Sequence, residues 1–346
     1  MTGPGVKVEC AAEIGRVRDT VADAVTDRLR AQHPDWIEGC GDQVPEHGVQ
    51  DPRRHIDFLH AAIELDDTAA FRDHTLWCRD LLGSRGIGAD PLAECLRTIR
   101  AELMDRLSPA AAEEAGLALD VGLRALALEP GATPVDERLP PASRLYLVAS
   151  VTGRRQAALA VVRESMDSGS SPVDVYVDVF QSALYEVGRR WQTAGLTIAE
   201  EHMATATTQF IVSVLHEEGQ RARLHRGTAV VTGVAQEQHA VGASIVANVL
   251  DEAGWDVRFL GTDLPHEGIV ATIVRSRAAL VAISVTMSGG VADAGALIER
   301  IRRAQPDPPR IIVGGAAFRH DPQLWRTVGA DGFAADARSL AELARR

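Results

Sequence analysis

The sequence predicts an α/β protein with added helical domains, in which two helical blocks precede a doubly wound parallel sheet. Three observations support this expectation. Apolar residues recur at helical spacing in residues 1–128, and four helical segments joined by short turns fill residues 142–223. In residues 227–346, short apolar strands alternate with helices. Residues 129–141 contain four prolines and one glycine, so we expect a linker between the first two blocks.

Composition and charge limit the functional classes. The chain has 346 residues, of which 46% are apolar and 24% charged, as in ordinary folded proteins with more than one core. A net charge of −12 argues against direct nucleic-acid binding, because phosphate binding needs clustered Lys and Arg. No apolar run is long enough for a membrane span, and the first residues lack the apolar core of a signal peptide. We therefore expect a cytoplasmic protein without a nucleic-acid or membrane partner.

The four cysteines all lie in the first hundred residues, at positions 10, 40, 78 and 95. None of them has metal-site spacing such as C-x-x-C, and the expected compartment is reducing. The sequence therefore predicts four reduced thiols.

The block from 1 to 128 is expected to be helical. Apolar side chains recur every three or four residues in two stretches, Ile14, Val17, Val21, Val25 and Leu29, and Leu92, Leu96, Ile99, Leu103 and Leu107. Further helices are expected in residues 55–60 and 70–82. Residues 35–52, rich in Gly, Pro and Asp, predict a loop.

The block from 142 to 223 contains helical segments at residues 143–152, 154–168, 172–192 and 199–221. Their short connections force neighbouring helices to run antiparallel. A four-helix bundle is therefore expected.

The block from 227 to 346 changes to the pattern of a parallel sheet. Apolar strands are expected at residues 229–231, 257–260, 279–285 and 311–313, with helices at 240–253, from 265, and at 291–303. Residues 329–332 stand in the place of a fifth strand end. Strands and helices that alternate in this way predict a doubly wound, flavodoxin- or Rossmann-like domain.

Polar and glycine residues follow the expected strands, at the edge where such sheets bind ligands. The first strand leads to the loop Glu237-x-His239-x-x-Gly242. The third strand ends with Ser284 and Thr286, and the fourth with Gly314-Gly315, whose missing side chains allow a bulky ligand to approach the backbone. On spacing alone, His239 could equally be a solvated residue before a helix.

The arrangement resembles the cobalamin-binding domain of methionine synthase and its relatives, which use a D-x-H-x-x-G loop, an S-x-L or S-x-T strand end and a GG turn. The resemblance implies that His239 is the lower cobalt ligand, in place of the dimethylbenzimidazole base. Glu237 stands where the family has Asp. A longer carboxylate can still accept the second N–H of a ligating imidazole.

The same resemblance assigns the remaining residues to the nucleotide tail of the coenzyme. It implies that Gly242 lets the helix start approach the tail and that Ser284 and Thr286 bind it. It also implies that Gly314 and Gly315 line its slot.

The helical bundle carries a second pattern. Trp191 ends its third helix, and nine residues separate it from Glu201-His202. Thr197 and Glu200 predict a capping box, which places Glu201-His202 in the first turns of the fourth helix. Alone, a tryptophan is usually a core residue and such a pair is usually solvated. Together these residues resemble the W-x9-EH signature of the CarH family of light-sensing cobalamin photoreceptors.

In that family the tryptophan and the Glu-His pair contact the 5′-deoxyadenosyl group above cobalt, and light releases this group and changes the oligomeric state. The resemblance implies adenosylcobalamin as the cofactor, light-dependent homo-oligomers and no catalytic turnover. Two features depart from the family. Residues 1–128 show no helix-turn-helix with a basic recognition helix, and Gln192 follows Trp191 where DNA-binding members have histidine.

An acidic helical domain before such a cap resembles the photocobilin subfamily, which pairs adenosylcobalamin with biliverdin. The resemblance implies a bilin in residues 1–128. Apolar side chains and polar anchors for it are available in Phe58, Leu59, Phe71, Trp77 and Leu81, and in His55, His60, His74, Arg72 and Cys78. The alternative is that these residues are ordinary parts of a dimerisation or partner-docking domain.

Two other functions fit the sequence. The first is a corrinoid methyl carrier that serves a separate methyltransferase. The second is a cobalamin-bound anti-repressor whose N-terminal helices bind a regulator. The chain shows no substrate barrel of the kind that a mutase or methyltransferase needs, so we expect a protein that is not itself an enzyme. The downstream partner is not identified by any motif.

Overall fold

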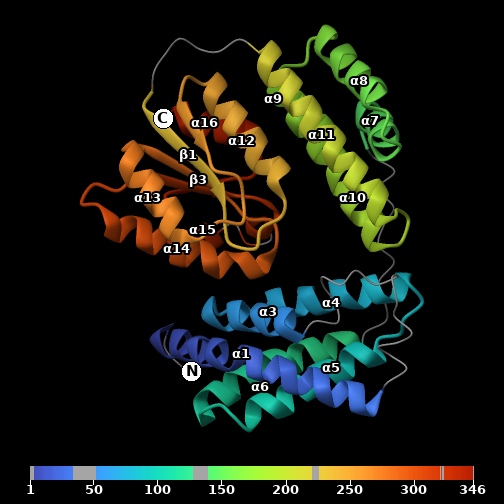
Figure 1. Cartoon of the computed structure of the whole chain (residues 1–346), viewed down its shortest axis with the longest axis vertical. Coiled ribbons are helices and arrows are strands. Elements are labelled where there is room, and N and C mark those ends of the chain that lie inside the picture. The colour runs from blue at the N-terminus through green and yellow to red at the C-terminus, as the bar shows by residue number, and fades with distance from the viewer. Residues whose placement is uncertain are drawn as a thin grey trace. The chain divides into compact units, whose positions relative to one another are not determined.

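Figure 1 shows the computed structural model of the chain, which describes residues 4–33, 52–127, 139–219, 226–319, 321 and 323–345. The chain divides into two compact units, Met1–Thr133 with Gln192–Ala194, and Pro134–Trp191 with Gly195–Arg346. Most of the expected loop at 35–52 and most of the expected linker at 129–141 lie outside the described residues. None of the described helices is both long and apolar enough to cross a membrane.

The first unit is helical. Its described helices are α1 (Pro4–Gln32), α3 (Pro52–Glu64), α4 (Thr68–Ser84), α5 (Asp90–Met104) and α6 (Pro109–Leu126). The helical spacing seen in the sequence is confirmed, because the side chains on these stripes are buried, among them Ile14, Val21, Val25, Leu96, Ile99 and Leu103.

The second unit begins with a helical cap. Its helices are α7 (Pro141–Val151), α8 (Arg155–Asp167), a third helix made of α9 (Pro172–Asp174), η2 (Val175–Gln181) and α10 (Ser182–Gln192), and α11 (Ile198–Glu218). The four expected helical segments are confirmed. The sequence did not predict that the third helix contains a π-helical stretch, η2. Its rings pack inward, with the centroid of Phe180 4.9 Å from that of Tyr146 in α7.

The rest of the second unit is a five-stranded parallel sheet in the order β2-β1-β3-β4-β5. The strands are β1 (Thr228–Gly233), β2 (Asp256–Phe259), β3 (Leu280–Ser284), β4 (Arg310–Gly314) and β5 (Gly332–Ala334). The helices are α12 (Ala240–Glu252), α13 (His266–Ser276), α14 (Val291–Ala304), α15 (Leu324–Thr327) and α16 (Ala337–Arg345). Helix α12 packs with α16, and α13 with α14, as right-handed crossovers on the two faces of a doubly wound sheet require (Figure 1).

The fifth strand corrects one expectation. Residues 329–332 were expected at the carboxyl end of a strand, but β5 begins at Gly332 and ends at Ala334. Gly329 has a φ of 78° and its N–H donates to Arg326 O, so it closes the turn after α15. The strand has only three residues, which is too short to give a period-two pattern in the sequence.

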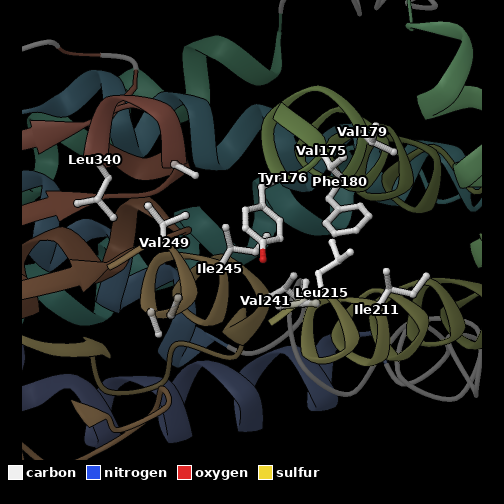
Figure 2. Packing of buried hydrophobic residues seen from close by; sticks show 14 of the residues in the cluster. Val175, Tyr176, Val179, Phe180, Ile211, Leu215, Val241, Ile245, Val249 and Leu340 are labelled. Atoms are coloured by element: carbon white, nitrogen blue, oxygen red, sulfur yellow. The ribbon is translucent and has the colours of Figure 1, made fainter. Parts of the chain in front are cut away.

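The cap and the sheet domain share one hydrophobic core. Figure 2 shows the rings of Tyr176 and Phe180 turned toward side chains of α11 and α12. The residues labelled there come from four elements: Val175, Tyr176, Val179 and Phe180 of η2, Ile211 and Leu215 of α11, Val241, Ile245 and Val249 of α12, and Leu340 of α16. Each large apolar side chain buried in this way contributes about 1.5–3 kcal/mol. The cap is therefore packed onto the sheet domain.

Candidate functional site

The strand register brings the carboxyl ends of four strands into one row. Ser284 of β3 is paired with Gly233 of β1 on one side and with Gly314 of β4 on the other. Gly314 is in turn paired with Ala334 of β5. The loops that follow β1, β3 and β4 therefore leave the sheet at the same edge.

The loop after β1 holds Glu237 and His239 as a hydrogen-bonded pair. His239 Nδ1 lies 2.6 Å from Glu237 Oε1, and the backbone N–H of His239 donates to the same oxygen over 2.9 Å. The other carboxylate oxygen, Oε2, accepts the backbone N–H of Thr286 over 2.6 Å. Glu237 is thus fixed by groups from two loops, and its side chain is only 2% exposed.

The imidazole of His239 points outward from this buried carboxylate and is 57% exposed. Because Glu237 accepts from Nδ1, the neutral ring keeps its lone pair on Nε2. His239 occupies the N-cap position of α12, but its side chain makes no capping hydrogen bond. The geometry therefore leaves Nε2 as the nitrogen available to a metal.

Electrostatics couple these two groups. Burial opposes ionisation of Glu237, but hydrogen bonds from the His239 side chain, the Thr286 N–H and the His239 N–H outweigh it and lower its pKa. The hydrogen bond to Glu237 raises the pKa of His239 against the opposing effect of burial, and the charges of Glu237 and Glu201 raise it further. A metal that binds Nε2 must displace a proton that is held more firmly than usual.

Two carboxylates that the sequence analysis did not identify support the same loop. Asp293 Oδ2, in the first turn of α14, accepts the backbone N–H of Ala235 over 3.0 Å. Asp263 Oδ1 accepts the backbone N–H of Gln236 over 2.7 Å. Gln236 and Asp263 have positive φ angles of 61° and 60°, an uncommon conformation for residues other than glycine. Aspartates in turns and first helical turns are common, so the sequence carried no specific signal for them.

The residues predicted to hold the nucleotide tail have different surroundings. A Cβ at Gly242 would lie 3.8 Å from Ser284 Oγ, an ordinary contact, so the start of α12 faces this hydroxyl. Cβ atoms at Gly314 and Gly315 would lie 2.9 Å from Ala334 O and 2.1 Å from Val285 O. The neighbouring backbone therefore requires glycine at both positions, a structural reason that the sequence analysis did not give. Whether they also line a slot stays a prediction.

The cap residues of the W-x9-EH pattern lie at the junction of α10 and α11. The predicted capping box is confirmed, since Thr197 and Glu200 cap the start of α11 reciprocally. Glu201 Oε1 accepts the hydroxyl of Thr205 over 2.8 Å, and Oε2 pairs with His202 Nδ1. The His202 side chain is 72% exposed. Trp191, one residue before the end of α10, is half-buried.

One electrostatic effect and one contact connect this part of the cap to the sheet domain. The charge of Glu201 raises the pKa of His239, so the start of α11 lies within electrostatic reach of the β1 loop. The guanidinium of Arg319, after β4, lies 5.2 Å from the ring centroid of Tyr185 in α10. The structure thus brings Glu201 toward the His239 loop, whereas it gives no direct hydrogen bond between the two.

Comparison with known protein families gives the two parts of this unit a common function. A family described as a B12 binding domain matches residues 227–344, and a second family of the same description matches residues 144–216. The chain is a cobalamin-binding protein. Its B12-binding cap and its B12-binding sheet domain confirm the expected fold and the expected class of cofactor.

Relatives of the cobalamin-binding chain fall into two groups. The HTH-type transcriptional repressor CarH of Myxococcus xanthus is 27% identical over 177 residues, which are 51% of this chain and 58% of that protein. Trimethylamine corrinoid protein 1 of Methanosarcina acetivorans is 25% identical over 195 residues, which are 55% of this chain and 89% of that protein. The chain thus spans little more than half the length of the CarH relative.

A solved structure supports the fold of the B12-binding part. The monomethylamine corrinoid protein of Methanosarcina barkeri matches 57% of this chain and 94% of its own length, with a TM-score of 0.52 and 20% identity. At this identity the likeness concerns the fold alone.

The residues of the B12-binding domain fit a cobalamin. Bound cobalamin would supply a cobalt ion that accepts a nitrogen donor from the protein. His239 would provide that nitrogen through Nε2, with Glu237 fixing the tautomer through Nδ1. The fit rests on an exposed imidazole backed by a buried, multiply hydrogen-bonded carboxylate, a common arrangement for a metal-ligating histidine.

The bilin candidates lie in the first unit, apart from this site in the sequence. His55, His74 and Cys78 are buried among one another, whereas His60 and Trp77 are half-buried. Phe58 stacks on His74 with ring centroids 3.7 Å apart. Leu59, Phe71 and Leu81 are core residues with at most 1% exposure. The candidates therefore do not share one accessible surface.

Proposed function

We propose that the protein is a light-sensing photoreceptor that binds adenosylcobalamin and changes its domain packing and oligomeric state when light removes the adenosyl group. The observation that carries the proposal is that the cap is packed onto the sheet domain, with Tyr185 of α10 5.2 Å from Arg319 after β4. The helix that carries Trp191 therefore contacts the edge of the sheet where the predicted cobalt ligand lies, and the charge of Glu201 at the start of α11 raises the pKa of His239. An upper ligand held above cobalt would then meet the cap.

The shared core supports a signalling role for this arrangement. Side chains of η2 and α11 are buried against α12 and α16 in one cluster (Figure 2). Arg338 of α16 also pairs with Asp174 and Asp178 of the third cap helix, at 2.8 Å each. Because densely packed interfaces switch between discrete arrangements, loss of a group between cap and sheet would change the packing in a two-state manner.

Light scattering tests the proposal. The full chain, loaded with adenosylcobalamin and purified in the dark, should change its mass after green light. The methylcobalamin-loaded protein is the control, since its cobalt–carbon bond also breaks in light but it lacks the adenosyl contacts. Equal masses of the adenosyl form in dark and light, at several protein concentrations, would contradict the proposal.

A corrinoid methyl carrier is the second candidate function. The match to trimethylamine corrinoid protein 1, which covers 89% of that protein, favours it. A carrier should bind methylcobalamin at least as tightly as adenosylcobalamin and should keep the same mass in dark and light. Preference for the adenosyl form together with a light-dependent mass would exclude this candidate.

The proposal extends to biliverdin as a second chromophore in the first unit. His60 and Trp77 are half-buried and could contact such a ligand, whereas His55, His74 and Cys78 are enclosed in the core. Coexpression with haem oxygenase should give a red-absorbing band. Without that band, and without stoichiometric uptake of added biliverdin, the first unit would be a docking module and cobalamin the sole chromophore.

A further inference from the structure

The first unit contains a cluster of three metal-ligating side chains that the cobalamin site does not use. His55 of α3 lies with Nδ1 3.0 Å from Nε2 of His74 in α4. Cys78, one turn further along α4, has its Sγ 3.7 Å from the same nitrogen. One ligand atom from each of the three residues falls within 4.8 Å of the other two.

All three side chains are enclosed. His55, His74 and Cys78 are exposed by 1%, 6% and 0%. Burial, followed by the charges of His55 and Arg54, holds the pKa of His74 well below its usual range. Burial also raises the pKa of the Cys78 thiol, and the neighbouring Cys95 adds to this effect. A metal ion bound by these enclosed side chains would therefore be shielded from solvent.

The three donors would fill three of the four ligand positions of a tetrahedral zinc ion. Zinc binds imidazole nitrogen at about 2.0–2.1 Å and thiolate sulfur at about 2.3 Å. These lengths separate two nitrogens by about 3.3 Å and a nitrogen from a sulfur by about 3.6 Å. The separations of 3.0 Å between the two nitrogens and 3.7 Å between His74 Nε2 and Cys78 Sγ are close to these values, and the ligand atoms of His55 and Cys78 lie within 4.8 Å of each other. A donor set of nitrogen and sulfur without oxygen also disfavours magnesium and calcium.

The local structure supplies these donors from two helices. His74 and Cys78 are four residues apart, so they lie on one face of α4. His55 comes from α3, which packs against α4. Phe58 stacks on the ring of His74 and limits its rotation. An ion at this point would bridge the two helices.

We propose that His55, His74 and Cys78 form a structural zinc site in the first unit. When zinc binds, the proton between His55 Nδ1 and His74 Nε2 moves to the other nitrogen of the ring that carries it, so both facing nitrogens donate lone pairs. The Cys78 thiol loses its proton to solvent and binds as thiolate, so one proton is released per ion. The site is independent of cobalamin and of the proposed light response.

Elemental analysis tests the site on the full chain. The protein, carrying no affinity tag and loaded with cobalamin, is analysed for zinc and cobalt by mass spectrometry after growth with added zinc. Wild type should contain zinc and cobalt in a ratio near one. Cys78→Ala and His74→Ala should lose the zinc but keep the cobalt, which shows that the sheet domain is still folded.

Cys10→Ala is the matched control, because Cys10 is also a buried cysteine but lies on α1 outside the cluster. It should keep the zinc. X-ray absorption at the zinc edge of wild type needs no variant, and it should show one sulfur and at least two nitrogens. Wild-type zinc no higher than that of Cys78→Ala, or a zinc shell without sulfur, would overturn the proposal and leave a hydrogen-bonded core cluster.

Discussion

Glu237 organises the candidate cobalt site at the scale of single residues. Its carboxylate is almost fully buried, yet three hydrogen bonds keep it ionised and fix the imidazole of His239. The partner of its second oxygen is a backbone N–H beyond β3, so the position of Glu237 depends on the sheet and not only on its own loop. The side chain of Glu237, which is longer than the Asp of the resembled family, reaches the backbone N–H of Thr286.

His239→Ala should remove the lower cobalt ligand. We expect bound cobalamin to become base-on or water-ligated, or to be lost, because His266, the other described imidazole that follows a strand end, pairs with Asp293 through Nε2. The absorption spectrum of the corrin measures this change. His216→Ala, which removes a cap imidazole that pairs with Asp251, is the control for the lower ligand. A spectrum and affinity unchanged in His239→Ala would show that the assignment is wrong.

Glu237→Gln should weaken cobalamin binding by about 10- to 100-fold, the usual cost of losing a partner of a ligating histidine. The variant should also change the pH dependence. Because Glu237 raises the pKa of His239, the imidazole of wild type becomes protonated, and lost to cobalt, at a higher pH than an ordinary histidine. In Glu237→Gln this acid loss should move to lower pH.

Cobalamin titrations across pH measure both effects, with Glu299→Gln, an exposed position on α14, as the control.

The stability of the cobalamin-free protein should also depend on pH, because the pKa values of Glu237 and His239 are both shifted in the folded state. The raised pKa of His239 stabilises the fold, and this stabilisation is complete below pH 6.5, the ordinary pKa of histidine. It is lost as the pH rises through the pKa of His239 in the folded protein. The lowered pKa of Glu237 stabilises above its ordinary value of 4.5, and this is lost as pH falls. The stabilisation by the pair should therefore be largest between these values.

Trp191→Ala should discriminate between upper ligands. An indole offers a flat apolar surface to an adenosyl group, whereas a methyl ligand covers little of it. We expect the affinity for adenosylcobalamin to fall much more than that for methylcobalamin. Trp325→Ala, which removes a tryptophan beside Arg326 on α15, should affect neither selectively. Equal losses for both cobalamins in Trp191→Ala would mean that Trp191 is only a packing residue.

At the scale of elements, the third cap helix connects the cap to the sheet domain. Its π-helical stretch buries Tyr176 and Phe180 in the shared core, and π-helical turns are frequent at functional sites. Its first turns also carry Asp174 and Asp178, which both pair with Arg338 of α16. One helix therefore holds the sheet domain by an apolar contact and by an ion-pair contact.

Arg338→Ala should loosen this second contact. The side chains are partly exposed, so we expect a loss of no more than about 1 kcal/mol in the free energy of unfolding. Bonds from Ser171 and then Arg338 lower the pKa of Asp174 to about 2. Its contribution is complete above its ordinary pKa of 3.8 and is lost as pH falls toward 2. Thermal unfolding at neutral pH and near pH 3 measures the effect.

Arg300→Ala is the control for Arg338→Ala, since Arg300 pairs with Glu267 within the sheet domain. It should leave the pH dependence of the cap unchanged. An Arg338→Ala variant as stable as wild type at both pH values would show that the apolar core alone holds the cap.

At the scale of the whole molecule, the proposed light response requires the cap to report on the cobalt site. Glu201 is the described cap residue whose charge reaches His239, and it also binds Thr205 within α11. Glu201→Ala should therefore change the mass of the dark assembly or its response to light, as measured by light scattering. Glu218→Ala, which removes an exposed carboxylate from the other end of α11, should not. Identical behaviour of Glu201→Ala and wild type would contradict a sensing role for this residue.

Local signals in the sequence determined the helical blocks, the parallel sheet and the loop that carries His239. Helical periodicity, strand length and capping boxes depend on residues that are neighbours along the chain, so they can be recognised without a structure. The pairing of Glu237 with His239 belongs to the same class, because only one residue lies between them. The resemblance of these local motifs to a known cobalamin-binding domain predicted the class of cofactor.

Only the tertiary structure decided how distant residues meet. Thr286, Asp263 and Asp293 support the His239 loop from other parts of the chain, and Gly315 is required by the backbone of Val285. The cluster of His55, His74 and Cys78 joins α3 to α4. Its residues do not have C-x-x-C spacing, so the sequence did not predict a metal site there. Such contacts depend on how helices and strands pack, and packing combines side chains whose separation along the chain carries no periodic signal.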